Sequence, residues 1–541
     1  MAPQEESKLV TATDETTTAP EVAEVEASGD EEDVDAADDA NPSGSASATK
    51  KKKKKKSKGK KTVSSAVAAA AAETLPKEVI DDIVKQNPAL ASELQGLDEN
   101  QISELVRKMK LEEILTGMSS GGKNRKDMAS YKFWATQPVS RFDEPEVELP
   151  DGPIRPTNPE VVPTEGAALL EGFEWVTVDL MDDAQMTEVY DLLTGHYVED
   201  QEAMFRFNYS KSFLDWALKA PGWLKEWHVG VRVVTTGKLV AFISGIPVNV
   251  RVRENTIKCS EINFLCIHKK LRSKRLTPVL IKEITRRCNV EKIWNAIYTG
   301  GIVLPKPIST CRYYHRSLDW LKLHEVGFSP LPPNSTKARQ ITRYHLGNQT
   351  KTKGLREMKI EDIDAVHELL ARYLARFDMA PIFDKAEIEH WFLNVDGPGR
   401  ERVIWTYVVE DAAGKITDMF SFYSLESSVI GNKKHDTIRA AYMFYYATES
   451  AFTGSRKDLR VRLNELVADA LVLAKKFNFD VFNGLTLMDN ALFLQEQKFG
   501  AGDGQLHYYL FNWRTAHING GIDSKNQPDE KNGSGVGMVM L

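Results

Sequence analysis

The chain has 541 residues, of which 42% are hydrophobic, and a formal net charge of -7. This length suits two or three domains, and the hydrophobic fraction is ordinary for a globular protein. No stretch approaches the roughly 18 continuous apolar residues of a membrane span, and no apolar run follows the N-terminal charges, so we expect neither stable membrane insertion nor a secretory signal. The four cysteines (Cys259, Cys266, Cys288 and Cys311) show no CxxC spacing. This excludes a metal site or disulfide framework and favours the cytoplasm.

The charges of the N-terminal region are segregated. Met1 to Thr49 is rich in Asp, Glu, Ala, Ser and Thr and has no aromatic residue, whereas Lys50–Lys61 contains ten lysines. Neither stretch can bury enough apolar surface to offset the entropy of ordering, so residues 1–65 are predicted to be disordered. Ten clustered cations bind polyanions, which leaves a nucleic-acid-binding protein as one interpretation. Because no aromatic residues interleave the lysines, we interpret the run as an accessory tether to ribosomes.

Residues 66–128 are predicted to form a helical appendage followed by a linker. Ile102, Leu105, Val106 and Met109 recur at spacings of three and four, which indicates a helix with one apolar face. A segment rich in Gly, Ser and Lys follows before residue 128. The main body of the protein is therefore expected to begin near residue 129.

From there, short strand-like runs alternate with helices. The expected strands of the first group are Trp175–Leu180, His228–Val234, Leu239–Val248, Ser260–Ile267 and Ile293–Tyr298. Those of the second group are Arg402–Val409, Asp418–Leu425, Arg439–Ala447, Asp480–Asn483 and Tyr508–Leu510. Leu459–Lys476 is predicted to be an amphipathic helix, because Leu463, Val467, Leu471 and Leu473 or Ala474 fall on one face. The pattern predicts a mixed α+β protein with two consecutive units, residues 129–340 and 341–541.

A cationic loop follows the fourth strand of the first group. Five of the seven residues from Lys269 to Arg275 are Lys or Arg, and a helix is expected to begin after them, with Thr277 as N-cap and Pro278 at the first position. A strand, a basic loop and a helix N-terminus in that order make an anion site, which suits a ligand with several phosphates, such as coenzyme A. The charges alone are equally consistent with a solvated loop.

Four segments together resemble the N-myristoyltransferase family, of the fungal type. They are EINFLCIHKKLRSKR (Glu261–Arg275), KFGAGDG (Lys498–Gly504), YKFWATQPV (Tyr131–Val139) and the apolar end GMVML (Gly537–Leu541). The resemblance implies two fused acetyltransferase-type (GNAT) units in a monomeric cytoplasmic enzyme. It also implies transfer of a myristoyl group from myristoyl-CoA, a co-substrate, to the N-terminal glycine of partner proteins, with no permanently bound cofactor and no metal.

The resemblance places acyl-CoA binding in the first unit. Arg272–Thr277 keeps the first Arg of the usual acetyltransferase phosphate loop, R/Q-x-x-G-x-G/A, but lacks both glycines, as is normal in this family. For Lys269 and Lys270, solvent exposure is as good an interpretation as contact. The implied acyl-CoA residues are Tyr131, Lys132, Phe133, Trp134, Ile262, Asn263, Phe264, Leu265, Lys270, Leu271, Arg272, Ser273, Lys274, Arg275, Leu276, Thr277 and Pro278.

Five residues are implied in the chemistry. The backbone N–H groups of Phe264 and Leu265 would form an oxyanion hole for the thioester carbonyl if the strand bulges there. Asn263 and Thr299 would hydrogen-bond the incoming amine. The family's general base is the α-carboxylate of the chain, here that of Leu541, and the apolar residues before it favour burial.

The resemblance assigns most of the peptide site to the second unit and adds contacts from the first. A strand-like segment with three aromatics on one face, Phe205, Phe207 and Tyr209, resembles the peptide groove, although such a pattern alone indicates a core face. Asp200 and Asp503, in loop-like settings, are expected to receive basic residues of a substrate or else to be surface turn residues. The full set is Tyr197, Val198, Asp200, Phe205, Phe207, Tyr209, His315 and Asp503.

Two alternatives concern the chemistry. Cys266 near a thioester, with His268 as its base, suggests a covalent acyl-enzyme. A buried structural cysteine is the favoured interpretation, because free cysteine is commonly buried and the family performs direct transfer. The second alternative is an ordinary N-acetyltransferase that uses acetyl-CoA, which retention of a long-chain acyl-CoA by the purified protein would exclude.

Overall fold

The computed structural model describes Met128 and residues 131–144, 150–159, 162–198, 204–272, 274–394 and 399–541. The predicted disordered region, the lysine run and the helical appendage lie outside these residues. Tyr131–Leu541 forms one compact unit.

Strands and helices alternate along this unit. The strands are β1 Gly152–Pro153, β2 Phe173–Thr177, β3 Phe205–Asn208, β4 His228–Val233, β5 Leu239–Val252, β6 Asn255–Ile267, β7 Asn295–Gly300, β8 Ser309–Ser317, β9 Leu355–Glu357, β10 Met379–Pro381, β11 Ile404–Glu410, β12 Ile416–Val429, β13 Thr437–Thr448, β14 Val481–Leu485, β15 Gly500–Phe511 and β16 Trp513–Arg514. The α-helices are α6 Asp183–His196, α7 Lys211–Leu218, α8 Leu276–Val290, α9 Trp320–Glu325, α10 Lys337–Arg343, α11 Ile363–Leu374, α12 Lys385–Phe392, α13 Ser450–Thr453 and α14 Arg456–Lys476. The 3-10 helices are η2 Trp134–Thr136, η4 Lys225–Trp227, η5 Lys269–Leu271, η6 Ile360–Asp362 and η7 Asn490–Leu492.

The mixed α+β fold is confirmed, and each of the ten predicted strands overlaps an observed one. The predicted helix Leu459–Lys476 is α14, which begins three residues earlier. A capping box of Ser455 and Asp458 fixes its start. One boundary was wrong: α8 begins at Leu276, after Arg275 in the left-handed region (φ 55°), so Thr277 is not the N-cap. Pro278 lies at the third helical position, where its missing N–H is still tolerated.

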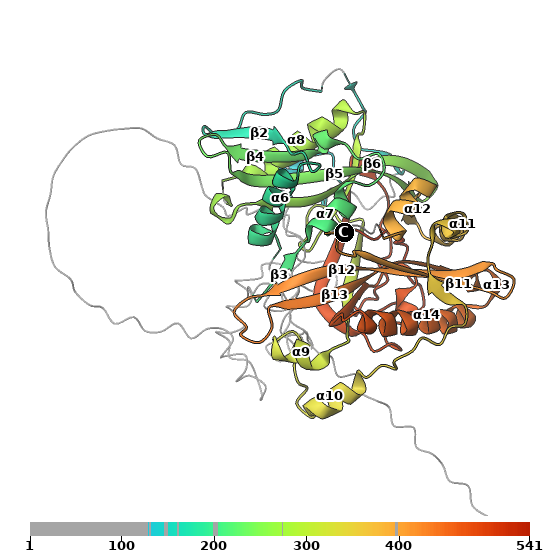
Figure 1. Ribbon diagram of the computed structural model, residues 1–541. Coiled ribbons are helices and arrows are strands. Elements are labelled where there is room, and N and C mark those ends of the chain that lie inside the picture. The colour runs from blue at the N-terminus through green and yellow to red at the C-terminus, as the bar shows by residue number, and fades with distance from the viewer. Residues whose placement is uncertain are drawn as a thin grey trace, which may run out of the picture. The chain divides into compact units, whose positions relative to one another are not determined.

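One sheet with 14 strands joins the two predicted units. Along its main path the order is β2-β4-β5-β6-β7-β15-β8-β14-β13-β12-β11-β9. Figure 1 shows the first series, blue-green to green, in the upper part of this unit and the second, orange to red, in the lower part, with the C-terminus between them. The order of antiparallel and parallel pairings is the same from either end of the sheet. Three antiparallel pairings lead to a parallel pair, which is β6 with β7 on one side and β13 with β14 on the other.

The two series exchange their last strands. β15, from the end of the chain, pairs antiparallel with β7 of the first series, whereas β8, from the first predicted unit (residues 129–340), pairs with β14 of the second. The two exchanged strands also pair with each other at the centre of the sheet. A division of the sequence at residue 340 therefore does not divide the sheet, and the functional boundaries of the two units stay a prediction.

Helices cover both faces of the first series. The buried side chains of α6, such as Val189 and Leu193, belong to the large core that also holds the second series. Those of α8, such as Leu280 and Ile284, pack on the opposite face against Val229 and Ile243. This division places a second, smaller core between α8 and the sheet.

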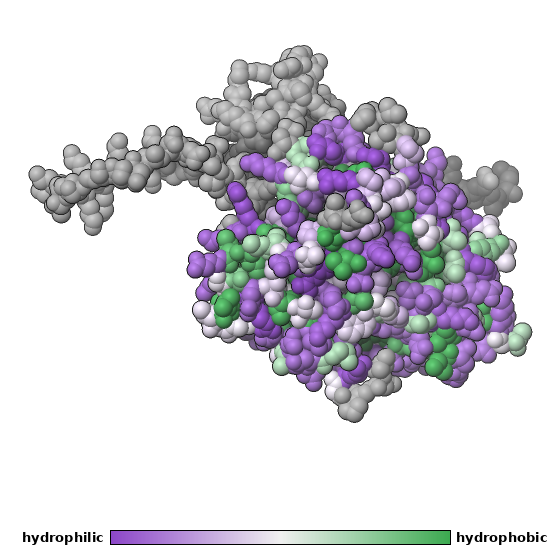
Figure 2. Space-filling model, turned by 90° about the horizontal axis from the view of Figure 1, so that it is seen from above, coloured by the Kyte–Doolittle hydropathy of each residue, from purple (hydrophilic) through white to green (hydrophobic). Residues whose placement is uncertain are grey.

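The surface carries no continuous apolar region on the face seen in Figure 2, where small hydrophobic patches alternate with polar side chains. In the described part of the chain, no helix is both long and apolar enough to cross a membrane.

Separate expression of the two halves tests the strand exchange. In a chain ending at residue 340, β7 would keep only its short parallel pairing with β6, at Cys259–Glu261, and would lose β15. We expect this half to show no cooperative thermal unfolding by circular dichroism, because buried strand edges need partners. Co-expression with residues 341–541 is expected to restore the cooperative transition of the full chain. A sharp transition in the isolated half would contradict the exchange.

Candidate active site

A cavity lies between α8 and strands β6 and β7. Its empty volume, which includes the open mouth, is about 790 Å³. The α8 side is mainly apolar, with Ile281, Ile284 and Cys288 at the spacing of one helical face. On the sheet side the lining includes Ile262–Leu265, Tyr298 and Thr299. The shape and lining suit a ligand with a long apolar part.

The segment Tyr131–Val139 closes one side of this cavity, where Trp134 is part of the lining. The Trp134 ring stacks on Tyr298, with ring centroids 5.7 Å apart and planes 10° apart, and Tyr298 stacks in turn on Tyr509. The Tyr131 hydroxyl donates to the Val303 carbonyl at 3.1 Å. Of the other two residues expected here, Lys132 is exposed and Phe133 is half-buried.

A β-bulge interrupts β6 beside the cavity. Cys266 pairs with Phe242 and Asn263 with Ser244, so Phe264 and Leu265 together oppose the single residue Ile243. Phe264 is buried and lies in the left-handed region (φ 55°). In a bulge the extra residue is left unpaired in the hydrogen-bond ladder, and a bulge at this place is the condition on which the expected oxyanion hole depends.

Asn263 and Thr299 reach the same region from adjacent strands. Both line the cavity. The Asn263 amide donates to the Glu261 carboxylate at 2.8 Å, and the Ser244 hydroxyl donates to the Asn263 carbonyl at 2.9 Å. Because its NH₂ group is used by Glu261, the side-chain oxygen of Asn263 remains as the acceptor for a third group.

Glu261 is a buried carboxyl that the sequence analysis did not single out. Its exposed fraction is 7%, and it has no ion-pair partner among the described residues. Burial raises its pKa to about 7, although the hydrogen bond from Asn263 acts in the opposite direction. Strongly shifted pKa values are more common at functional sites than elsewhere, so Glu261 is a candidate site residue. A charged residue inside an otherwise apolar strand was the signal that could have indicated it.

The basic loop begins as the 3-10 helix η5 and continues to the start of α8. Lys269, Lys270, Lys274 and Arg275 are exposed, and Leu271, Leu276, Thr277 and Pro278 are half-buried. Arg272 donates to the His196 carbonyl at 2.6 Å, which ties the loop to the end of α6. Ser273 lies outside the described residues. The cationic residues expected to bind phosphates directly precede the N-terminus of α8.

The aromatic residues of the predicted peptide groove form a buried group around Phe264. The Tyr209 ring lies 5.1 Å from Phe264 at 86°, and Tyr197 lies 5.9 Å from it. Phe207 contacts Tyr209, and Phe205 contacts Phe328, which in turn contacts His315.

The remaining predicted peptide contacts are less uniform. The Val198 carbonyl accepts from Phe207 N–H at 3.2 Å. Asp503 is exposed, but it lies within β15 at an irregular pairing rather than in a loop. His315 pairs with Asn483 at 2.7 Å, and burial lowers its pKa. Asp200 lies outside the described residues.

The end of the chain runs into the large core. Val539 and Met540 are buried, and Leu541 is half-buried and packs against the same core. Gly537 N–H donates to the Met379 carbonyl at 2.7 Å, and Met488 N–H donates to the Val536 carbonyl at 2.8 Å. The expectation that the terminus is carried into the core is therefore met.

The geometry favours a structural Cys266 over a nucleophile. Its thiol is buried and donates to the Leu192 carbonyl at 3.8 Å, and burial raises its pKa to about 12. His268 packs instead against His196, with ring centroids 3.9 Å apart. A thiol with so high a pKa is almost entirely unreactive at neutral pH. Within the described residues, no group of three or more His, Cys, Asp or Glu side chains could hold a metal ion.

Two domain profiles of one family match the chain. The N-terminal domain of the family described as Myristoyl-CoA:protein N-myristoyltransferase matches residues 153–311, and its C-terminal domain matches residues 325–539.

Individual relatives agree with these profiles. A Glycylpeptide N-tetradecanoyltransferase of Aspergillus fumigatus is 60% identical over 471 residues, covering 87% of this chain and 96% of the relative. The one of Saccharomyces cerevisiae is 52% identical over 426 residues, covering 77% and 93%. A crystal structure of Saccharomyces cerevisiae N-myristoyltransferase with bound myristoyl-CoA superposes with a TM-score of 0.74 at 53% identity, covering 76% of this chain and 94% of that one.

Replacement of Glu261 by Gln tests the burial of its carboxyl. The folded pKa of about 7 is above the ordinary value of 4.5, so the wild-type protein loses stability as the pH rises from the ordinary pKa to the folded one, whereas the variant has no group to ionise. We expect the variant to gain about 2.5 kcal/mol relative to wild type between pH 5 and pH 8. Urea unfolding at both pH values measures this gain, and parallel stabilities of the two proteins across this range would contradict it.

Proposed function

Since the chain belongs to the N-myristoyltransferase family, we propose that it transfers a myristoyl group from myristoyl-CoA to the N-terminal glycine amine of proteins by direct attack on the thioester. The observations that support this assignment at individual residues are a cavity lined by Phe264 and Leu265, the β-bulge formed by these two residues, and a chain end that enters the core. We assign a role to each of the three.

The acyl chain would occupy the cavity against α8. Burial of about a dozen methylenes contributes up to about 10 kcal/mol, far more than any single polar contact. The phosphates of CoA would bind the loop between Lys270 and Arg275, where the N–H groups at the start of α8 add to the cationic side chains. With the chain in the cavity and the phosphates at the loop, the thioester carbonyl would meet the bulge at Phe264 and Leu265.

The amine would approach from the side of the chain terminus. An N-terminal ammonium has a reference pKa of about 8 and must lose a proton before it attacks. We assign this proton to the Leu541 carboxylate, while the Asn263 side-chain oxygen and the Thr299 hydroxyl hold the amine. The new C–N bond forms, the C–S bond breaks, and the departing CoA sulfur takes up one proton. The second proton lost by the ammonium passes to solvent.

The peptide that carries the glycine would lie along the aromatic group. The substrate-binding set is Tyr197, Val198, Asp200, Phe205, Phe207, Tyr209, His315 and Asp503. The support for it is that Tyr197 and Tyr209 contact Phe264, the residue at the bulge. A peptide that reached this buried group would present its first residue to the proposed oxyanion hole.

Several further assignments stay predictions. They are the division of labour between residues 129–340 and 341–541, the monomeric state, the cytoplasmic location and the ribosome tether at Lys50–Lys61.

The phosphate loop can be tested by replacing Arg272 and Lys274 with Ala. We expect free CoA and myristoyl-CoA to bind about tenfold to a hundredfold more weakly, because each lost charge-assisted hydrogen bond is worth about 1.5–3 kcal/mol and the exposure of the loop reduces it. Binding should persist for myristoyl-CoA because its chain is untouched. Isothermal titration calorimetry measures both affinities, with Lys258→Ala, an exposed lysine on β6, as the matched control. Unchanged affinities for both ligands would exclude the loop.

The base can be tested by C-terminal amidation of the intact chain through semisynthesis. Amidation preserves the packing of Leu541 and removes its charge, so the single-turnover rate of amide formation should fall by orders of magnitude while acyl-CoA affinity holds. The control is the same ligated chain with its free carboxylate. A near-normal rate in the amidated enzyme would rule the carboxylate out as the base.

A further inference from the structure

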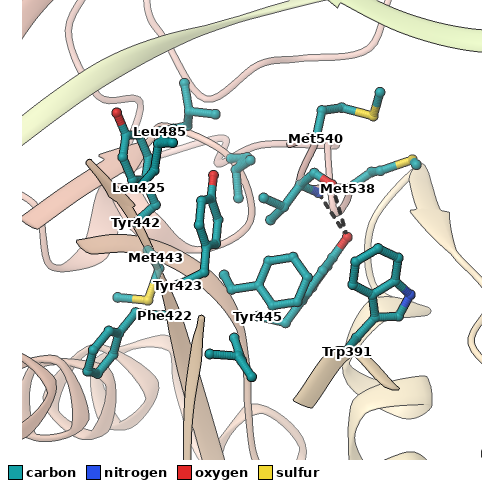
Figure 3. Close-up of a cluster of buried hydrophobic side chains, with 14 of the residues drawn as sticks. Trp391, Phe422, Tyr423, Leu425, Tyr442, Met443, Tyr445, Leu485, Met538 and Met540 are labelled. Atoms are coloured by element: carbon teal, nitrogen blue, oxygen red, sulfur yellow. Dashed lines mark hydrogen bonds between the residues drawn. The ribbon is translucent and has the colours of Figure 1, made fainter. Parts of the chain in front are cut away.

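Two tyrosine hydroxyls hold the backbone just before the chain terminus. The Val539 N–H donates to the Tyr445 hydroxyl at 2.9 Å, and that hydroxyl also lies 3.5 Å from the Val539 carbonyl. Figure 3 shows both contacts converging on Tyr445 from the segment between Met538 and Met540. The Tyr508 hydroxyl donates to the Met538 carbonyl at 2.9 Å. Tyr445 lies on β13 and Tyr508 on β15, so two strands hydrogen-bond the C-terminal tail, Gly537–Leu541.

Tyr445 lies in a second β-bulge. Phe420 pairs with Tyr446 and Phe422 with Met443, so Phe444 and Tyr445 together oppose the single residue Ser421. The Ser421 hydroxyl donates to the Tyr445 carbonyl at 2.8 Å.

This bulge occupies the same place in its series as the first. Both are in the last antiparallel pairing before the parallel pair, β5 with β6 and β12 with β13. By register, Tyr445 therefore corresponds to Leu265 of the first series.

We propose that Tyr445 is a positioning residue, which fixes the Leu541 carboxylate by holding the Val539 peptide unit. The proposal rests on the assignment of that carboxylate as the base. The two equivalent bulges would then have different roles in the reaction. The first would bind the thioester oxygen, and the second would position the base.

The chain geometry makes this hold effective. Only one residue separates Val539 from Leu541, and a residue spans at most about 3.6 Å, so a fixed Val539 confines the carboxylate to a small region. A displacement of about 1 Å at a reacting group can slow a reaction about a hundredfold.

The neighbourhood of Tyr445 connects the tail to the amine site. Burial raises the pKa of the Tyr445 hydroxyl, and the electrostatic effect of the Glu261 carboxyl raises it further. Glu261 accepts from Asn263. Tyr508 is directly opposite Thr299 in the pairing of β15 with β7. Tyr508 therefore holds the tail opposite Thr299, and Tyr445 is linked electrostatically to Glu261, the hydrogen-bond partner of Asn263.

The test compares Tyr445→Phe with Tyr446→Phe. Tyr446 is the adjacent residue on β13, is equally buried, donates to Asn490 at 2.7 Å and accepts from Asp489 N–H at 3.0 Å, so its variant also loses a buried hydroxyl but keeps the tyrosine hydrogen bonds to Met538 and Val539. We expect Tyr445→Phe to reduce the single-turnover rate of amide formation about a hundredfold, and Tyr446→Phe to reduce it less than threefold. Myristoyl-CoA affinity should be unchanged in both, and thermal unfolding verifies that both fold.

The same substitution in the C-terminally amidated chain separates the two proposals. A role through the carboxylate predicts that Tyr445→Phe slows the free-carboxylate enzyme but not the amidated one. Equal slowing of both backgrounds, or equal rates of the Tyr445 and Tyr446 variants, would overturn the positioning role while leaving the base assignment intact. A normal rate on amidation alone would instead overturn the base assignment. If Tyr445→Phe does not fold, Tyr508→Phe, which releases Met538, is expected to give the same pattern.

Discussion

The antiparallel pairing of β15 with β7 is the constraint on which the rest of the structure depends. It brings residues from the end of the sequence into the middle of the first series. The tail that follows β15 then lies near β6 and β7 instead of at the outer edge of the second series. Without this exchange, the chain terminus would lie apart from the cavity and the bulge of the first series.

Burial of polar groups gives the site its chemical character. The pKa of the Glu261 carboxyl is raised to about 7 because the group is removed from water without a cationic partner. The same removal from water would raise the pKa of a terminal carboxylate and lower that of an ammonium beside it. The difference between the two pKa values would then be smaller, and proton transfer from the ammonium to the carboxylate would cost less free energy. Phe264 and Tyr445 belong to the buried core that keeps solvent from this region.

The sequence allowed the strands, α14 and the basic loop to be predicted, because hydrophobic periodicity and clustered charge are local signals. The family motifs supplied Asn263, Phe264 and Thr299, but no pattern showed why Phe264 lies in a bulge. The bulge depends on the register between β5 and β6, which is a property of pairing and not of one strand. Tyr445 was missed for the same reason: it reads as an ordinary strand aromatic, and its partner Val539 lies 94 residues away.

The strand exchange has a consequence for synthesis of the chain. About 200 residues separate β7, which ends at Gly300, from β15, which begins at Gly500. At roughly 5–20 residues per second this is a delay of about 10–40 s. During that interval the nascent first series has an open edge at β7, which can pair with other chains. A cell that makes this protein must therefore shield a half-finished sheet until its last strand emerges.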